Sequence, residues 1–411
     1  MKYEPYTIFS ISIIIVYILV MLKPNDEFEE LAYFKSQLPI KGKNTTSTLA
    51  IGLKTGIETS LERVPVQLET FLQYDNPLIV SDFDEIIENY TVFNILPNGI
   101  QRDALPFNRH PGTSKDGDNR GWELDAHKNI PGFVKMKDQF LDSKWYIMID
   151  DDTYLFKNNL IQHLKTLDPM APYYLGMGLS FLGCDNVENL GDGPLFAHGG
   201  SGIVLSKMAL EKLASVADSC TVQYKGCWGG DIKTALCLRD AGILYNAEAS
   251  KGSFDGDSIH KYHFKDPCAT PFSFHHLKTF EIRLLHDLES DIAFKFGPEA
   301  TVNMGQLFKW FSEKDPFSTF RDYHTRTLTD NSGKLIEFKY RKGLDLKGQD
   351  YNHFESTLDE CMLACYQDEK CLSWSYIENE NTCWLKDRIP THEKSVESYS
   401  GWFEEKFQCN K

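Results

Sequence analysis

Three consecutive carboxylates, Asp150, Asp151 and Asp152, directly follow the apolar run Trp145–Ile149. Such a run is typical of a buried strand, so the carboxylates are predicted to lie at its end. Adjacent carboxylates repel one another unless a cation is bound, and their hard oxygen atoms suit Mn²⁺ or Mg²⁺. The alternatives are a solvated acidic turn and a helix N-terminus, where negative charge is also favourable.

The segments around the triplet predict strands that alternate with helices. Leu49–Leu53 and Leu78–Val80 are short apolar strands, and Ser60–Tyr74 and 158–167 have apolar residues at helical spacing. This alternation is typical of an α/β architecture with a mainly parallel sheet, whose sites lie outside the carboxyl ends of the strands. Both short strands end, like the strand before the triplet, in polar residues, which are Lys54-Thr55 and Ser81-Asp82.

Later segments carry further groups that could take part in chemistry. Gly199 and Gly200 lie in HGGSGIVLS, where the backbone can approach a ligand closely, although a tight turn before a helix is the alternative. Asp231 opens a predicted helix and is either a functional carboxylate or a cap. His275 and His276 follow an aromatic run, and imidazole is a common metal ligand, although partly buried packing would also explain them.

Length, charge and composition limit the class of protein. The chain has 411 residues, enough for two domains. Hydrophobic residues make up 42% of it and aromatic residues 13%, so packed cores are expected. A formal net charge of −16 argues against nucleic acid as a partner.

The N-terminal residues predict a membrane segment. Residues 6–22 carry no charge and are almost wholly apolar, and Lys2 and Lys23 lie on either side. The segment is short for a membrane-spanning helix but longer than a usual signal-peptide core, and no small-residue cleavage site follows it. We therefore expect an uncleaved signal anchor at 6–22, with a cytosolic tail at 1–5 and a stem at 23–47.

The predicted compartment of the remaining chain is the lumen of the secretory pathway. Asn44 and Asn89 begin Asn-X-Thr sequons for N-glycosylation. Ten cysteines, many of them closely spaced, suit an oxidising environment. Both observations favour a single-pass type II membrane protein.

Taken in order, these segments resemble the fringe and core-1 β-1,3-galactosyltransferase family of inverting, A-type glycosyltransferases over residues 49–277. The stretches that carry the resemblance are LAIGLKTG, RVPVQLETF, LIVSD, WYIMIDDDTYL, HGGSGIVLSKMAL, GGDIKTALCLRDAGI and SFHHL. The resemblance implies a catalytic domain at 48–320 with an α/β fold, a Rossmann-like mixed sheet flanked by helices. The chain departs from the family in the CWGG before Asp231 and in the loop at 100–140, which leaves the donor and the acceptor open.

The resemblance also implies roles for the acidic residues and the first histidine. Asp152 would be the carboxylate ligand of Mn²⁺, or of Mg²⁺, and His275 the second protein ligand. The ion would neutralise charge on the departing UDP. Asp151 would contact the ribose or sugar of the donor, and Asp150 would support the cluster. Asp231 would be the general base that takes a proton from the acceptor hydroxyl.

Contacts to the UDP-sugar are implied for a second group of residues. Arg63 matches a family position that contacts the nucleotide, and Gly199 and Gly200 would approach the substrate. Asp82 and Lys128 are weaker candidates for the donor site, and Lys128 could equally be a solvated lysine.

The C-terminal part is different in kind. Residues 321–340 predict a linker to a small cysteine-rich domain at 341–411, within which GLDLKGQDYNHFESTLDECMLACYQDEKCLSWSYIENENTCWLK resembles a PAN/apple domain, a disulfide-stapled α+β module. The resemblance implies the bonds Cys361–Cys383 and Cys365–Cys371. Zinc binding is the rival, disfavoured by the oxidising lumen and the lack of a Cys-X-X-Cys pair. Such modules bind proteins or carbohydrates.

The numbers of cysteines predict a bond between the two domains. Each domain holds five, so each would leave one unpaired. In the second domain the apple-like pattern leaves Cys409, and Cys268 is its preferred partner because it lies late in the first domain in a Pro-flanked loop. The alternatives are a free Cys409 and a bond between two chains.

Two classes of function follow. The preferred one is an enzyme of the Golgi membrane, with its catalytic domain in the lumen, that moves galactose or N-acetylglucosamine from a UDP-sugar to a glycan hydroxyl. A β-1,3 linkage, as in N-acetylgalactosaminide β-1,3-galactosyltransferases, is the expected type. The alternative is a catalytically degenerate membrane protein that binds carbohydrate or protein through the PAN/apple domain.

Overall fold

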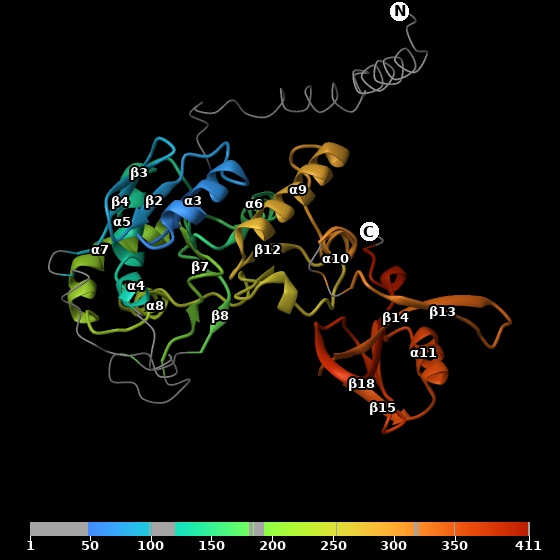
Figure 1. The fold of residues 1–411 in the computed structure, drawn as a ribbon. Helices are drawn as coiled ribbons and strands as arrows, with labels where there is room; N and C mark the ends of the chain where they lie inside the picture. Colours follow the sequence, from blue (N-terminus) through green and yellow to red (C-terminus); the bar gives the residue numbers. More distant parts are fainter. Residues whose placement is uncertain are drawn as a thin grey trace, which may run out of the picture.

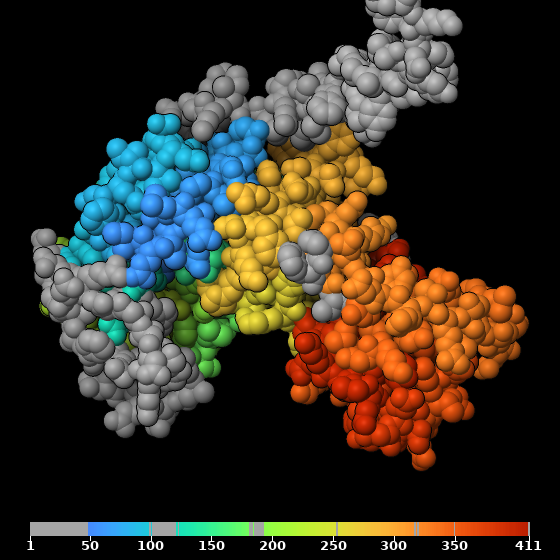
Figure 2. Space-filling model, viewed as in Figure 1, coloured from blue at the N-terminus to red at the C-terminus, as the bar shows by residue number. Residues whose placement is uncertain are grey.

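The computed structural model describes residues 48–97, 100, 120–180, 184, 193–251, 253–315, 318, 320–348 and 350–409. The proposed signal anchor at 6–22, the stem and the sequon at Asn44 lie outside these residues. Within the described part of the chain, no helix is both long and apolar enough to cross a membrane. Figure 1 shows a larger N-terminal domain and a smaller C-terminal module, and Figure 2 shows them as two lobes joined through the yellow and orange segments.

A seven-stranded sheet forms the centre of the larger domain, in the order β3-β4-β2-β1-β5-β10-β7. Its strands are β1 (Leu49–Lys54), β2 (Leu78–Ser81), β3 (Glu85–Ile87), β4 (Tyr90–Asn94), β5 (Trp145–Asp150), β7 (Tyr174–Leu175) and β10 (Ile203–Ser206). The pairs β4-β2, β2-β1 and β1-β5 are parallel, whereas β3, β10 and β7 add antiparallel pairs. The sheet is therefore mixed, as the family resemblance implied. Alternating elements alone favoured a mainly parallel sheet, but they do not determine how the outer strands are connected.

Helices cover both faces of this sheet (Figure 1). One face packs against α3 (Ser60–Glu69), α6 (Lys157–Leu164), α9 (Thr279–Phe296) and α10 (Met304–Lys314). The other face packs against α5 (Asn129–Gln139), α7 (Lys207–Gln223) and α8 (Gly230–Asp240), and the short α4 (Arg120–Asp125) precedes α5. Side chains of β5 alternate between the two cores, since Trp145, Ile147 and Ile149 face the first and Tyr146 and Met148 the second. The three-layer α/β architecture predicted from the sequence is confirmed.

The sequence predicted the N-cap of α7 correctly but placed the end of α3 too late. Ser206 precedes α7 and its hydroxyl accepts a hydrogen bond from the Ala209 N–H, as the N-cap prediction requires. Helix α3 ends at Glu69, several residues before the predicted Tyr74. Turns follow in its place, so the apolar spacing alone placed the helix end too late.

Two small sheets bring later segments to the end of β5. One contains β6 (Tyr154–Leu155), β11 (Ser253–Phe254) and β12 (Pro271–Phe274), and the other contains β8 (Gly178–Leu179) and β9 (Phe196–Ala197). Because β12 pairs with β6, the residues just after β12 lie beside those just before β6.

The C-terminal module is a six-stranded antiparallel sheet packed against α11 (Leu358–Gln367). Its strands are β13 (His324–Thr329), β14 (Leu335–Leu346), β15 (Asp350–Glu355), β16 (Ser373–Ile377), β17 (Thr382–Lys386) and β18 (His392–Trp402). The prediction of a linker at 321–340 was wrong, because most of this segment is the β13–β14 hairpin. The hairpin is largely exposed and therefore polar, while Ile336 and Phe338 enter the core of the module.

Five disulfides use all ten cysteines of the chain. Cys361–Cys383, Cys365–Cys371 and the inter-domain bond Cys268–Cys409 are the pairs that the sequence analysis gave. Two more bonds, Cys184–Cys227 and Cys220–Cys237, lie in the larger domain. No zinc site is left for the cysteines of the module.

The two domains share a continuous core. Ile389, Trp402 and Phe407 of the C-terminal module belong to the same apolar cluster as β1 and β5. Phe264 and Ile389 exchange two backbone hydrogen bonds of 3.1 and 2.8 Å across the boundary. Together with the Cys268–Cys409 bond, these contacts fix the module against the larger domain, so it does not hang on a linker.

Candidate active site

The strand register sends the side chains of the acidic triplet in different directions. In the parallel pair β1–β5, Leu53 lies opposite Ile149, and Lys54 lies opposite Asp150. Alternation places Asp150 on the face of Lys54 and Asp151 on the opposite face, toward α3. The three carboxylates therefore have three different sets of partners.

Asp151 is a structural residue that joins three elements. One of its oxygens accepts hydrogen bonds from the hydroxyls of Thr55 and Thr59, both at 2.6 Å. The other accepts from Arg63 at 2.9 Å, and the side chain of Gln67 binds the Asp151 carbonyl at 2.7 Å. Burial raises the pKa of Asp151, although Arg63 and the two hydroxyls act in the opposite direction.

The contact of Asp151 with the donor, which the resemblance implied, stays a prediction. Asp151 is 4% exposed and both of its oxygens bind protein groups. Asp150, which was expected only to support the cluster, faces the cavity described below. The two neighbours lie on different sides because a strand turns adjacent side chains to opposite faces.

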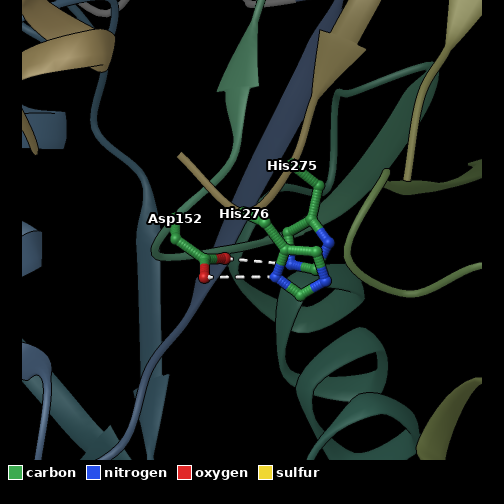
Figure 3. Close-up of side chains that lie close together, drawn as sticks. All are labelled: Asp152, His275 and His276. Carbon is green, nitrogen blue, oxygen red and sulfur yellow. Dashed lines mark ion pairs between the residues drawn. The ribbon is translucent and has the colours of Figure 1, made fainter. Parts of the chain in front are cut away.

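Asp152 lies beside both histidines of the Ser-Phe-His-His segment (Figure 3). Its Oδ1 is 2.9 Å from Nε2 of His275, and its Oδ2 is 4.0 Å from Nδ1 of His276. Arg63 donates to Oδ2 at 3.1 Å. One oxygen of Asp152 and one nitrogen from each histidine all lie within 4.8 Å of one another, so the three side chains can converge on one ion.

Backbone contacts fix the position of His275. Its Nδ1 lies 3.3 Å from the carbonyl oxygen of Gly256, and the Leu277 N–H donates to the Asp152 carbonyl at 3.0 Å. Gly200 packs against the imidazole so closely that a Cβ there would lie 2.1 Å from its Cε1. Glycine is therefore required at this position. An Nδ1–H bonded to a carbonyl leaves the Nε2 lone pair for a metal, the usual arrangement of a metal-binding histidine.

Asp152 and His275 change each other's proton affinity. Burial alone would raise the pKa of Asp152, but the hydrogen bond and charge of His275, together with Arg63, hold that pKa below its usual range. Burial alone would lower the pKa of His275, but the bond to Asp152 and the charges of Asp150 and Asp152 raise it.

The residues fit a divalent cation. Asp150 is paired through Oδ1 with the Lys54 ammonium, at 3.1 Å. Its Oδ2 is 3.7 Å from Nε2 of His275, close to the Asp152 cluster. A mixture of carboxylate oxygen and imidazole nitrogen suits Mn²⁺ better than Mg²⁺, which prefers oxygen ligands alone.

Asp231 lies in the first turn of α8 and faces the glycine turn that follows β9. Its Oδ2 accepts the N–H of Gly199 at 3.1 Å, and its Oδ1 accepts the N–H of Ile232 at 2.9 Å. Gly229, not Asp231, occupies the N-cap position of α8. The bond to Gly199 ties the carboxylate to another element, a contact that a simple helix cap would not make.

A cavity of about 340 Å³ brings these groups together. Predicted residues in its wall are Asp150, Gly199, Gly200, Asp231 and His275. The wall also contains His276 and residues that the sequence analysis did not propose for the site, notably Lys54, Asp125, His198 and Trp228. The volume is within the usual range for small-ligand sites.

Lys54 and Asp125 form an ionic bridge in the cavity wall. Lys54 is 5% exposed and pairs with both Asp125 and Asp150. Burial would lower its pKa, but the two carboxylates raise it above the usual lysine value. The register could have indicated Lys54, since it lies opposite Asp150, whereas Asp125 lies in an irregular part of the sequence with no pattern to mark it.

Asp82, Lys128 and Arg63 lie next to the cavity but do not line it. Lys128 is 1% exposed, so the alternative of a solvated lysine was wrong. Its ammonium donates to the Thr55 carbonyl at 2.7 Å and to Asp82 at 3.1 Å, which ties the ends of β1 and β2 together. Burial would raise the pKa of Asp82, but the charge and hydrogen bond of Lys128, together with backbone hydrogen bonds, lower it. Contacts of these residues with a nucleotide remain a prediction.

The second sequon lies at the tip of the β3–β4 hairpin. Asn89 is exposed and has a φ of 71°, a left-handed conformation that asparagine tolerates in tight turns. The side chain is accessible, and its glycosylation stays a prediction.

The candidate active site lies within the part of the chain that matches the model of a known protein family. A model of the Fringe-like family matches residues 125–330, half of the chain, and a PAN domain model matches residues 344–386. The first match contains Asp150–Asp152, Asp231 and His275, whereas β1, α3 and β2 precede it.

Similarity to individual proteins is confined to short segments. Chondroitin sulfate synthase 3 of Homo sapiens and that of Mus musculus are each 29% identical over 113 residues, which are 26% of this chain and 12% of the synthase. An uncharacterized protein of Acanthamoeba polyphaga mimivirus is 36% identical over 94 residues, 22% of this chain and 27% of the viral protein. The chain thus matches a small part of each relative's length.

Proposed function

The chain belongs to the Fringe-like family, and from this premise we propose that it is a metal-dependent glycosyltransferase that moves a hexose from a UDP-sugar to a glycan hydroxyl. One observation carries the proposal. His275 and His276, which with Asp152 can hold an ion, line the same cavity as the candidate base Asp231.

The donor side of the reaction is assigned to the cluster around Asp152. Asp152, His275 and His276 would hold Mn²⁺, and Asp150 would face it from the cavity wall. When bound, the ion supplies charge stabilisation to the leaving diphosphate. The fixed Nδ1 contact of His275 keeps Nε2 directed at the cluster, so the ligands are positioned before the ion arrives.

The acceptor side is assigned to Asp231. An inverting transfer breaks the bond from the anomeric carbon to the diphosphate and forms one to the acceptor oxygen on the opposite face. The hydroxyl proton passes to a base, here a carboxylate oxygen of Asp231. The Gly199 N–H holds the carboxylate in place, which lowers the cost of orienting it.

Finer features of the function are part of the same proposal. Galactose and N-acetylglucosamine are the candidate sugars, with a β-1,3 linkage. The similarity to proteins named chondroitin sulfate synthase supports a glycan as acceptor. A Golgi location with the catalytic domain in the lumen fits the five disulfides. A degenerate binding protein is less favoured, since the candidate ligands and base are all present.

The test is an enzyme assay on the purified full-length protein. UDP release from a panel of UDP-sugars is measured with Mn²⁺, with Mg²⁺ and with a chelator, in the presence of glycan acceptors. Release that needs Mn²⁺ and one particular sugar supports the proposal. Absence of both UDP release and UDP–Mn²⁺ binding by calorimetry would contradict it and favour the binding protein.

A further inference from the structure

His198 ends the strand segment that leads into the glycine turn and lies between the two halves of the site. Its N–H donates to the Met177 carbonyl at 2.8 Å, and its own carbonyl accepts the Ser201 hydroxyl at 3.0 Å. The backbone of this residue is therefore fixed on both sides. Its imidazole is half-buried and forms part of the cavity wall.

The hydrogen bond to Nδ1 determines which tautomer the ring adopts. The Ser201 N–H donates to Nδ1 of His198 at 3.2 Å. A ring nitrogen that accepts a hydrogen bond carries no proton, so the proton of the neutral imidazole is on Nε2. Among the described residues, none accepts a hydrogen bond from this Nε2–H. The Nε2–H of His198 is thus available to a molecule in the cavity.

The neighbours of His198 define which part of a substrate it would meet. The next residue, Gly199, holds Asp231, and the ring of His275 is 5.4 Å from the ring of His198, measured between centroids. In an inverting transfer the anomeric carbon lies between the acceptor oxygen and the leaving diphosphate. A group between the base and the metal cluster therefore faces the sugar that is transferred.

We propose that His198 recognises the donor sugar by donating its Nε2–H to one hydroxyl oxygen of that sugar. This inference rests on the proposed function and deepens it. A neutral N–H matches an uncharged hydroxyl, whereas a phosphate would be served better by a charged donor. His198 is in this view a residue that selects among UDP-sugars, and Asp231 and the metal cluster are common to all of them.

Two substitutions separate the hydrogen-bonding role of the His198 Nε2–H from the structural role of the ring. In His198→Asn the side-chain oxygen can replace Nδ1 as acceptor of the Ser201 N–H, but nothing replaces Nε2–H. In His198→Gln the longer amide can place its NH₂ group near the position of Nε2. The Asn variant should therefore keep the glycine turn and lose the sugar contact, and the Gln variant should recover part of it.

Calorimetry on the full-length protein with Mn²⁺ compares UDP with the UDP-sugar that serves as donor. We expect His198→Asn to bind UDP within about twofold of the wild type and to bind the UDP-sugar about tenfold more weakly, the effect of one lost hydrogen bond. His198→Gln should lie between the two. A series of monodeoxy UDP-sugars identifies the hydroxyl, since its removal should weaken the wild type about tenfold and leave His198→Asn unchanged.

Each contrary outcome has a distinct meaning. Unchanged affinity of His198→Asn for the UDP-sugar would overturn the inference. An equal loss for UDP and UDP-sugar would also overturn it, because His198 would then act through the turn or the metal cluster. If the wild type bound neither ligand, the proposed function itself would fail.

Discussion

The two sides of the β5 tip contain the same kinds of group and use them differently. On the side of α3, Asp151 is buried and saturated by Thr55, Thr59 and Arg63. On the side of the cavity, Asp150 pairs with Lys54, and Asp152 meets two imidazoles. Adjacent carboxylates thus serve as a structural joint and as candidate ligands. What distinguishes them is the kind of partner, since hydroxyls and a guanidinium cannot bind a metal ion with the carboxylate, whereas imidazoles can.

Two buried lysines, Lys128 and Lys233, also differ in the kind of partner that their charge has. Lys128 is 1% exposed and its ammonium is neutralised by Asp82. Lys233 is 2% exposed, and its ammonium lies 2.9 Å from Nδ1 of His127, an uncharged partner. Burial lowers the pKa of Lys233 to about 8, and burial with the nearby Lys233 and Lys225 lowers the pKa of His127 to about 4. The charge of Lys128 is thus neutralised by a carboxylate, whereas the charge of Lys233 has an uncharged imidazole as its partner.

The largest effect is expected at Asp152. Asp152→Ala removes the carboxylate of the metal cluster and should lower sugar transfer by about 10³-fold. UDP binding should lose its dependence on Mn²⁺, while thermal unfolding stays close to the wild type. Asp138→Ala, which alters an exposed aspartate of α5, is the matched control. Unchanged UDP–Mn²⁺ affinity in calorimetry would rule out Asp152 as a ligand.

Asp231 should affect turnover alone. Asp231→Asn keeps an oxygen for the Gly199 N–H but cannot take a proton, so kcat should fall about 10²-fold. The Kd for UDP with Mn²⁺ should stay within about twofold, because the substitution leaves the metal cluster intact. Steady-state kinetics and calorimetry on one preparation give both numbers, and normal turnover would place the base elsewhere.

Asp151 should affect stability more than chemistry. Asp151→Ala leaves two buried hydroxyls and the Arg63 guanidinium with fewer partners, and should lower the free energy of unfolding by about 2–3 kcal/mol. Urea unfolding measures this loss. A variant as stable as the wild type would show that the saturated side of β5 is not a structural joint.

The smallest effect concerns pH and Lys233. Its pKa is about 8 in the folded chain, against an ordinary value of 10.5, so the unfolded chain binds more protons between these values. The free energy of unfolding should therefore rise as pH increases through this window, by on the order of 2 kcal/mol.

Lys233→Met supplies the control for this prediction. It should remove the rise with pH and stabilise the protein at neutral pH, because the buried charge is gone. Urea unfolding at about pH 8 and about pH 10, compared between the two proteins, measures the difference across this window. An identical pH dependence would exclude Lys233 as its source.

Much of this protein was determined by local sequence pattern. The apolar run before the triplet, the helical spacing and the polar strand ends were sufficient to predict the α/β layers and to mark the triplet, whereas the roles of Asp152, Asp231 and His275 were implied by the resemblance to the family. These predictions work because burial imposes a period on each element that can be read without its neighbours. The Cys268–Cys409 bond was predicted from the odd cysteine count of each domain together with the apple-like pattern, which leaves Cys409 over.

Contacts between distant segments were decided only by the tertiary structure. Which side Asp150 and Asp151 face depends on the β1–β5 register, and the direction of β10 depends on connections that have no sequence signature. His198 became a candidate only once its ring was found in the wall of the same cavity as Asp231 and His275. A residue type shows which chemistry a side chain can perform. Whether that side chain is free to perform it depends on hydrogen-bond partners that folding brings from elsewhere in the chain.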